Sequence, residues 1–338
     1  MGENHLKFLF VGILLIFAAA GQMNKPENGD IVKVPAQGWP ASGGKVEAPR
    51  EQRVLLAQLK TQTPNVNQEI ITEPAEILPI KNLDIKDPEL DVKAALVKDL
   101  DDNINLYAFN ADLRWPLASL IKLMSAVITI EDVGLNKEVD ISEFAIASEG
   151  VAGKFEAGEK YLAGELVKAM LLVSSNDAAA AIAEFYGKDN FVKQMQSKAY
   201  FLGMNQATFS DPTGILSTNS GTVNDLEILV RYILEKHPGI FKATAQQKAE
   251  IFSSKGGSAS GGEDTKIIKK ELLNINSYAS SRPNFLGGKT GFTDEASGNL
   301  ISIFEHKGHK ILFIVFGTSN RFEQTDILFN WVKEAYTF

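Results

Sequence analysis

The feature that most constrains the fold is the order of strand-like and helix-like hydrophobic patterns along the chain. Strand-like segments at 94–97 and 104–109 flank the polar turn 101–103 and predict a β-hairpin. Helical spacing dominates the middle of the chain, and strand-like segments return at 286–293, 298–305 and 311–317. Strand signals at both ends with helices between them predict an α+β fold, with one sheet made from both termini and helices packed against it.

Helical spacing and boundary residues predict six helices in this folded part. The predicted helices cover 117–131 (with Pro116 in the first turn), 164–172, 177–187, 189–201, 223–235 and a closing helix 322–336. The polar sequence Ser174-Ser175-Asn176 lies between the second and the third of these helices. It predicts an elbow that aims polar side chains into a cleft, although N-capping explains one of these residues equally well. The helical part is expected to be an all-helical subdomain that carries this elbow.

The N-terminal segment differs from the rest in composition. Residues 6–20 are apolar except for Lys7, and they are too few to cross about 30 Å of hydrocarbon, which takes about 20 residues. A short apolar stretch that ends in three alanines predicts a signal peptide at 1–20, cleaved after Ala20; a short membrane anchor is the alternative. Scattered proline, glycine and polar residues predict a flexible linker at 21–75, so the folded domain is expected at 76–338.

Charge and cysteine content exclude several functions. The net charge of −8 and the lack of a basic stretch argue against binding of nucleic acid. The chain has no cysteine, which excludes disulfides, a lipid-anchor cysteine and cysteine catalysis.

Ser119 and Lys122 could form a nucleophile and its base. One helical turn separates them, so their side chains share a helix face with Cβ atoms about 5–6 Å apart. A serine hydroxyl is a poor nucleophile until a base removes its proton, and a lysine amine can act only when it is neutral. Lys122 lies within an almost wholly apolar helix, which favours burial and a lowered pKa over the alternative of a solvated surface lysine.

The triplet Lys289-Thr290-Gly291 follows two glycines and enters a predicted strand. Glycine there permits the close approach of a ligand or of another backbone. Lys289 and Thr290 would offer donors to a substrate carboxylate, and the charge of Lys289 could lower the pKa of Lys122 further. An exposed hairpin strand with an ordinary lysine is the alternative.

In this order the three motifs resemble the Ser-x-x-Lys, Ser-x-Asn and Lys-Thr-Gly set of penicillin-recognising enzymes. The surrounding segments are similar to the low-molecular-mass D-alanyl-D-alanine carboxypeptidases over about 94–331. These segments include WPLASLIKLMSA, LLVSSNDAAAAIAE, FSDPTGI, TVNDL, GGKTGFTDEASGNL and RFEQTDILFNW. The resemblance implies a β-lactamase/transpeptidase-like fold with an antiparallel sheet.

The resemblance also implies roles for the motif residues. Ser119 would be the acylated nucleophile, Lys122 its general base, and Ser174 a relay that carries the proton toward the leaving amine. The backbone amides of Ser119 and Phe292 would form the oxyanion hole. The substrate-binding residues implied in this way are Asn176, Lys289, Thr290, Gly291, Phe292 and Arg321, of which Arg321 would bind the terminal carboxylate. No metal and no cofactor is expected.

By this resemblance the chain is expected to be a serine-type D-Ala-D-Ala carboxypeptidase that trims terminal D-alanine from peptidoglycan stem peptides and is inhibited by β-lactam antibiotics. It would act after export, on the periplasmic or extracellular side, with membrane contact only through its N-terminal segment. Two alternatives stay open, because the motifs do not separate them: a D,D-endopeptidase that cleaves cross-links, and a penicillin-recognising sensor with little turnover.

Three rival functions lack the residues they need. A class A β-lactamase needs a glutamate in a Glu-x-x-Leu-Asn loop, and the nearest sequence, 132–136, has aspartate and is misplaced. A Ser-His-Asp hydrolase would need a Gly-x-Ser-x-Gly elbow, which we do not find. His306 and His309 flank a turn and could suggest a metal site, but without convincing further ligands a solvated hairpin is expected. Ser297 and Asn299, which repeat the Ser-x-Asn pattern, are expected to be structural.

Overall fold

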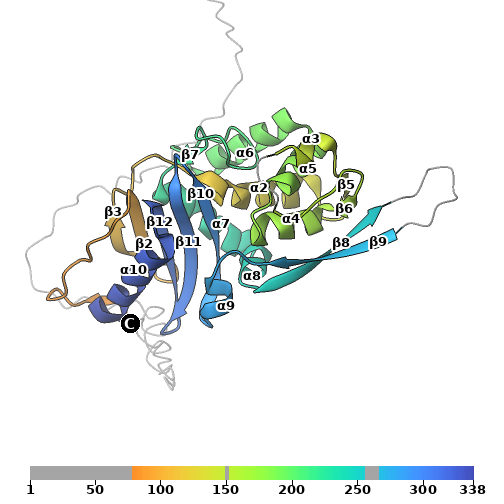
Figure 1. Ribbon diagram of the computed structural model, residues 1–338. Coiled ribbons are helices and arrows are strands. Elements are labelled where there is room, and N and C mark those ends of the chain that lie inside the picture. Colours follow the sequence, from red (N-terminus) through yellow and green to blue (C-terminus); the bar gives the residue numbers. More distant parts are fainter. Residues whose placement is uncertain (1–77, 149–151, 256–265) are drawn as a thin grey trace, which may run out of the picture. The chain divides into compact units, whose positions relative to one another are not determined.

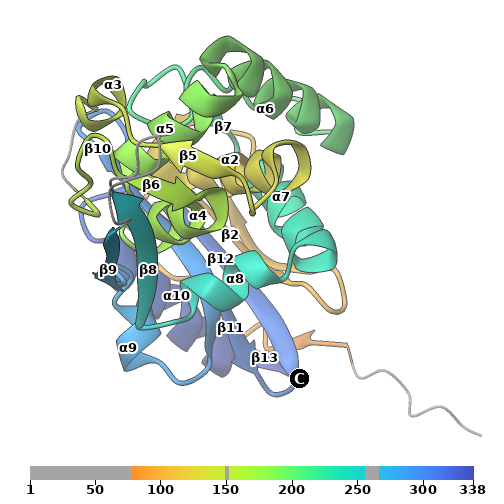
Figure 2. The same ribbon diagram turned by 90° about the vertical axis from the view of Figure 1, so that its right-hand side faces the viewer.

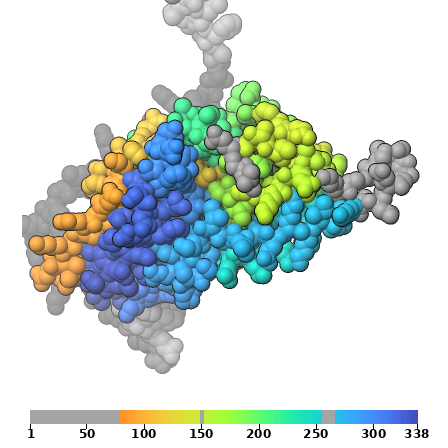
Figure 3. Space-filling model, in the orientation of Figure 1, coloured from red at the N-terminus to blue at the C-terminus, as the bar shows by residue number. Residues whose placement is uncertain are grey.

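A five-stranded antiparallel sheet forms the centre of the part of the chain that the computed structural model describes, residues 78–148, 152–255 and 266–338. Its strands lie in the order β10-β11-β12-β2-β3, so the two ends of the folded part form one sheet. In Figure 3 the orange early segment and the dark blue final segment accordingly lie against each other. The strands are β2 (Ala94–Asp99), β3 (Ile104–Phe109), β10 (Phe285–Thr293), β11 (Ser297–His306) and β12 (His309–Thr318).

Alternate residues of these strands enter two separate cores, as the period of two requires. In β12, Leu312, Ile314 and Phe316 face a core shared with the helical part. Ile311, Phe313 and Val315 instead face a second core, which helix α10 (Arg321–Ala335) completes. Both faces of the sheet are therefore covered, with α10 on one side and α7 (Val223–Lys236) and α8 (Gly239–Thr244) on the other (Figures 1 and 2).

The helical part lies between the early and the late strands in sequence. Its longer helices are α2 (Lys122–Ile128), α4 (Ala163–Leu172), α5 (Asn176–Tyr186), α6 (Lys188–Leu202) and α7 (Val223–Lys236). The short helices are α3 (Glu143–Ile146), α8 (Gly239–Thr244) and α9 (Tyr278–Ser281). Two further pairs of short strands join distant segments: β1 (Ile80–Lys81) pairs with β13 (Tyr336–Thr337), and β4 (Trp115–Pro116) pairs with β7 (Ser220–Gly221).

The predicted α+β class and the sheet made from both termini are confirmed, but the helical subdomain is not all-helical. It carries a second, four-stranded sheet of β5 (Glu138–Asp140), β6 (Lys160–Leu162), β8 (Lys248–Lys255) and β9 (Lys266–Leu273). Two of these strands have only three residues, too short for a periodic signal. In β9 (KIIKKELL), apolar and charged residues come in runs of two and three and Ile267 and Leu273 are exposed, so the sequence lacks the alternation of a half-buried strand.

The helix predicted at 117–131 begins differently from the prediction. Pro116 lies not in its first turn but in β4, where it pairs with Ser220. A 3₁₀ turn, η1 (Ala118–Ile121), follows before α2, and a π-helical turn, η2 (Thr129–Val133), ends the segment. Ala118 has φ +50°, a left-handed backbone conformation that is strained for a residue with a side chain. The strained residue directly precedes Ser119.

The elbow between α4 and α5 forms where it was predicted. Ser175 caps α5 by accepting a hydrogen bond from the amide of Ala178. Ser174 has φ +58°, and this left-handed residue turns the chain between the two helices.

The predicted signal peptide or anchor and the predicted linker, 1–75, lie outside the described residues, so both stay predictions. Within residues 78–148, 152–255 and 266–338, we find no helix with the length and hydrophobicity that a membrane crossing requires.

Asn299 is a structural link between the sheet and the segment that leads to Ser119. Its buried side chain donates to the carbonyl of Pro116 and accepts from the amide of Gly317.

We predict that Asn299→Ala lowers the free energy of unfolding by about 2–4 kcal/mol, because it leaves two backbone groups without partners. Asn284→Ala serves as the control, since it removes a partly exposed side-chain bond to Glu305 and should cost about 1 kcal/mol or less. Denaturant unfolding of both variants checks this; equal losses would contradict it.

Candidate active site

The amine of Lys122 lies at the centre of the site. Its Nζ is 2.8 Å from Ser119 Oγ, 2.7 Å from Asn176 Oδ1 and 2.5 Å from the carbonyl oxygen of Thr213. The lysine is fully buried, in the first turn of α2, among the apolar residues that hold this helix against α4 and α6. Ser119 lies one turn earlier, in η1. The sequence prediction of a shared helix face therefore agrees with the observed geometry.

The three partners of Lys122 determine what its amine can do. Carbonyl oxygens only accept hydrogen bonds, so Asn176 Oδ1 and the Thr213 carbonyl can take both hydrogens of a neutral amine. The lone pair of that amine then faces the third partner, the hydroxyl of Ser119, which can donate to it. In this state the amine is oriented as the proton acceptor of Ser119.

Burial favours the neutral form of the Lys122 amine. It lowers the pKa of Lys122 from 10.5 to about 7, although the carboxylate of Asp211 opposes this shift. Burial is the main cause of this shift, and the repulsion between the two lysine charges that the sequence suggested lowers the pKa of Lys289. At neutral pH a substantial fraction of Lys122 is therefore uncharged.

Ser174 and Lys289 form a second pair in the same site. Lys289 Nζ donates to Ser174 Oγ at 2.9 Å and to the carbonyl of Thr290 at 2.8 Å. Only 1% of Lys289 is exposed, which excludes the alternative of a surface lysine on an exposed hairpin. Burial lowers the pKa of Lys289 well below its usual value, and the charges of Lys122 and Arg321 lower it further.

The Lys-Thr-Gly strand lies directly against η1. A Cβ atom at Gly291 would come within 3.0 Å of the Leu117 carbonyl and 3.3 Å of the Ala118 side chain. The glycine therefore permits the close approach of another backbone, as expected. Thr290 is buried, whereas Phe292 exposes 61% of its surface at the end of β10.

Arg321 stands near this end of β10, at the start of α10. Its Nη1 would lie 3.6 Å from a Cβ atom at Gly298, the residue that pairs with Phe292 across the sheet. The guanidinium is partly buried, and its Nε finds no hydrogen-bond partner among the described residues. A cationic group with a buried, unused donor is suited to a carboxylate.

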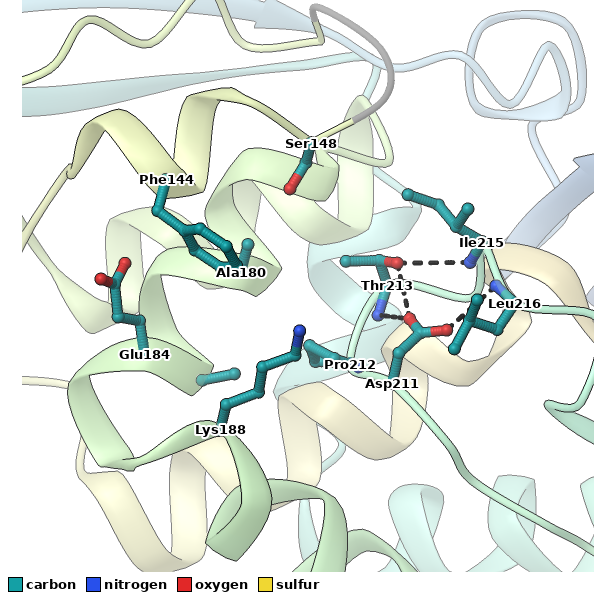
Figure 4. A pocket seen from close by; sticks show the side chains of 11 residues that line it. Phe144, Ser148, Ala180, Glu184, Lys188, Asp211, Pro212, Thr213, Ile215 and Leu216 are labelled. Atoms are coloured by element: carbon teal, nitrogen blue, oxygen red, sulfur yellow. Dashed lines mark hydrogen bonds between the residues drawn. The ribbon is translucent and has the colours of Figure 1, made fainter.

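The loop 211–216 was missed as part of the site. The carboxylate of Asp211 accepts bonds from the amides of Thr213 and Leu216 (Figure 4), and further ones from the amide of Gly214 and from Asn219 Nδ2. It thus holds the Thr213 carbonyl that binds Lys122. Gly214, with φ +89°, lies so close to η1 that a Cβ atom there would be 2.2 Å from the Ala118 carbonyl. The segment FSDPTGI, in which an aspartate precedes several turn amides, was the available signal.

An open cleft of about 530 Å³ gives access to Ser119. Its lining residues are Ser119, Asn176, Gly214, Ile215, Phe292, Thr293, Asp294 and Glu295. The loop 211–216 also lines a neighbouring, more apolar cavity of about 480 Å³, with Phe144, Ala180 and Lys188 around it (Figure 4). None of the motif residues lines that cavity, so the cleft is the candidate reaction site.

The structure thus brings all three motifs together. Ser119, Lys122 and Asn176 form one hydrogen-bonded group, Ser174 and Lys289 form another, and Thr290, Gly291, Phe292 and Arg321 lie along the adjoining strand and helix end. For Asn176 the structure adds a contact that was not expected: its side-chain oxygen accepts a hydrogen bond from Lys122. Its binding of substrate stays a prediction.

Known proteins of similar sequence are named as D-alanyl-D-alanine peptidases. A profile of the D-alanyl-D-alanine carboxypeptidase family matches residues 81–320. The chain is 28% identical to the D-alanyl-D-alanine carboxypeptidase DacF of Bacillus subtilis, over 68% of this chain and 58% of that protein. It is 29% identical to a D-alanyl-D-alanine endopeptidase of Pseudomonas aeruginosa, over 72% of this chain and 78% of that protein.

Solved structures show the same fold. The Streptomyces K15 DD-transpeptidase superposes with a TM-score of 0.66 at 20% identity, over 74% of this chain and all of that one. A D-alanyl-D-alanine carboxypeptidase of Mycobacterium tuberculosis superposes with a TM-score of 0.64 at 24% identity, over 75% and 96% of the two chains. The predicted transpeptidase-like fold is confirmed. With the family profile matching most of its folded part, the chain belongs to the D-alanyl-D-alanine carboxypeptidase family.

Proposed function

We propose that this enzyme removes the terminal D-alanine of peptidoglycan stem peptides through an acyl-enzyme on Ser119. The observation that carries the proposal is the buried Lys122 amine, whose two hydrogens have carbonyl acceptors and whose third partner is Ser119 Oγ at 2.8 Å. Such an amine can take the serine proton as the hydroxyl attacks.

In the acylation step, Ser119 Oγ forms a bond to the carbonyl carbon of the penultimate D-alanine while Lys122 accepts the hydroxyl proton. The peptide C–N bond then breaks, and the departing D-alanine nitrogen takes up a proton. Ser174, bonded to Lys289, is the proposed donor for that nitrogen. Water completes the cycle by hydrolysing the ester, and β-lactams would acylate the same serine.

Hydrogen-bond donors beyond the nucleophile, with the guanidinium of Arg321 among them, suit the free carboxylate of the substrate. Lys289, Thr290 and Arg321 lie along β10 and the start of α10, and Arg321 Nε is an unused buried donor. A terminal carboxylate in front of this end of β10 would place the last peptide bond over Ser119. The amides of Ser119 and Phe292 are the proposed oxyanion hole, in which one donor is typically worth about 3–4 kcal/mol.

A D,D-endopeptidase is the second candidate, because relatives of similar identity carry that name. Incubation with a D-Ala-D-Ala pentapeptide and with a cross-linked muropeptide, followed by mass analysis, separates the two. We predict release of D-alanine from the pentapeptide by the wild type and by Ser297→Ala, which alters another Ser-x-Asn sequence, at the start of β11. Ser119→Ala should lose both this release and covalent labelling by a fluorescent penicillin.

Cleavage of the cross-link alone would favour the endopeptidase. Labelling without release of any product would indicate the sensor that the motifs leave open, and persistent labelling of Ser119→Ala would place the nucleophile elsewhere.

The rate of acylation should follow the protonation of Lys122. Its pKa of about 7 means that the amine carries a proton at lower pH and cannot accept the one from Ser119. We predict that the rate of penicillin acylation falls about tenfold per pH unit below pH 7 and is level above it. Stopped-flow labelling between pH 5 and 9 measures this. A profile that rises toward pH 10 instead would show that Lys122 keeps an ordinary pKa.

The close contact at Gly214 allows a test of the oxyanion geometry. Gly214→Ala adds a Cβ atom 2.9 Å from the Ser119 amide nitrogen and should slow penicillin acylation about 100-fold, because a displacement of about 1 Å costs that much. Gly203→Ala is the matched control. Gly203 has a similar φ, +85°, and open space around its Cβ position, so both variants pay about 1–2 kcal/mol of backbone strain. Equal acylation rates of the two variants would contradict the assignment.

We further propose export through residues 1–20, from their sequence. The family acts on the cell-wall side of the membrane, and a short apolar stretch that ends in Ala18-Ala19-Ala20 fits a cleaved signal. Residues 21–75 would then be a flexible linker that separates the folded domain from the N-terminal segment. The mass of the mature N-terminus tests this, and an intact Met1 in the membrane fraction would indicate an anchor, with membrane contact through this segment.

A further inference from the structure

A cluster of three metal-ligating side chains lies outside the active site. We propose that Asp99, Asp102 and His309 bind a divalent transition-metal cation, with Zn²⁺ the best match. Nothing in the proposed function requires this site.

The fold brings the three residues together from two turns. Asp99 ends β2, Asp102 belongs to the turn before β3, and His309 begins β12, which pairs with β2. Asp99 is fully buried, and its Oδ1 accepts from the amides of Asp101 and Asp102 at 3.0 and 3.2 Å. These bonds fix the carboxylate so that Oδ2 points at His309.

The geometry fits metal ligands better than a hydrogen bond. His309 Nδ1 is 2.8 Å from Asp99 Oδ2 and 3.5 Å from Asp102 Oδ2. Yet these three atoms are buried and none has a hydrogen-bond partner, since the ring N–H is not directed at either oxygen. With ligand distances of about 2.1 Å, the two separations correspond to ligand–metal–ligand angles of about 84° and 113°. Both lie in the range found in zinc sites of four to five ligands.

Charge and donor type select the cation. Two carboxylates and one imidazole give a net negative site, and the neighbouring Lys310 does not neutralise it because its amine and amide bind Asp101. An imidazole ligand suits Zn²⁺, whereas Ca²⁺ takes oxygen ligands. His309 also packs against the ring of Phe338 at 5.0 Å, which holds its orientation.

The site would stabilise the fold rather than act in the reaction. His309 is at the opposite end of β12 from Thr318, whose partner Gly298 lies beside Arg321 and the cleft. A bound cation would join the β2–β3 turn to the start of β12 and so fasten the early strands to the late ones.

The test is a thermal melt of the chelator-treated protein with added Zn²⁺, and with Ca²⁺ as the control cation. At a Zn²⁺ concentration about 100-fold above the dissociation constant, we expect the wild-type Tm to rise by about 5–10 °C, with one equivalent bound by calorimetry. Asp102→Asn, a surface-turn change that keeps its size, should lose both effects. His306→Asn, which alters the other histidine of the same hairpin, should keep them.

No rise with Zn²⁺, or the same rise in Asp102→Asn, would overturn the proposal and leave a metal-free ion pair between His309 and Asp99. Release of D-alanine should be similar in all three proteins. Failure of the metal response therefore leaves the proposed function untouched, and loss of peptidase activity leaves the metal site untouched.

Discussion

The burial of one lysine amine is the condition on which the chemistry of this protein depends. An exposed lysine keeps its proton at neutral pH and cannot serve as a base. Here α2 places Lys122 at the meeting point of the helical core and the central sheet, where solvation of the charge is lost. The loss is compensated by oxygens from two other segments, Asn176 at the elbow and Thr213 in the loop 211–216. The same two contacts orient the lone pair toward Ser119.

Several strained or unusually close backbone positions follow from this arrangement. Ala118, which directly precedes Ser119, and Ser174 itself adopt left-handed conformations. Gly214 and Gly291 allow a loop and a strand to touch η1 from two sides. Strain of this kind persists only where the surrounding structure holds it, and such positions concentrate at functional sites. The Asp211 carboxylate, with its several backbone bonds, is the group that holds the loop in place.

Lys122 and Lys289 are both buried, but their hydrogen-bond partners differ. Lys122 contacts two carbonyl oxygens and a hydroxyl, which suits a neutral amine. Lys289 contacts Ser174 and its own neighbouring carbonyl, and it lies in the field of Arg321. This division favours a base beside the nucleophile and, near Arg321, a set of hydrogen-bond donors for the substrate carboxylate.

Much of this organisation could be predicted from the sequence. Long elements with a clear period, such as α7 and β12, were found near their true bounds, and the three motifs contain the residues that meet in the site. Features that depend on distant contacts were not predictable. The apolar pattern of 117–131 does not show that Pro116 pairs with Ser220, and the short or highly charged strands of the second sheet carry little signal. The two histidines of one turn suggested a metal site without further ligands, because Asp99 and Asp102, which lie beside His309, belong to another hairpin.

The most direct test of this account is an NMR titration of Lys122 in protein labelled with ¹³C and ¹⁵N at lysine, with its signal assigned by its loss in Lys122→Met. Such a titration reads the protonation of the amine itself, without substrate or turnover. The account predicts a midpoint at about pH 7. A midpoint near 10.5, the value of a solvated lysine, would show that the amine is charged in the resting enzyme and would contradict its role as the base.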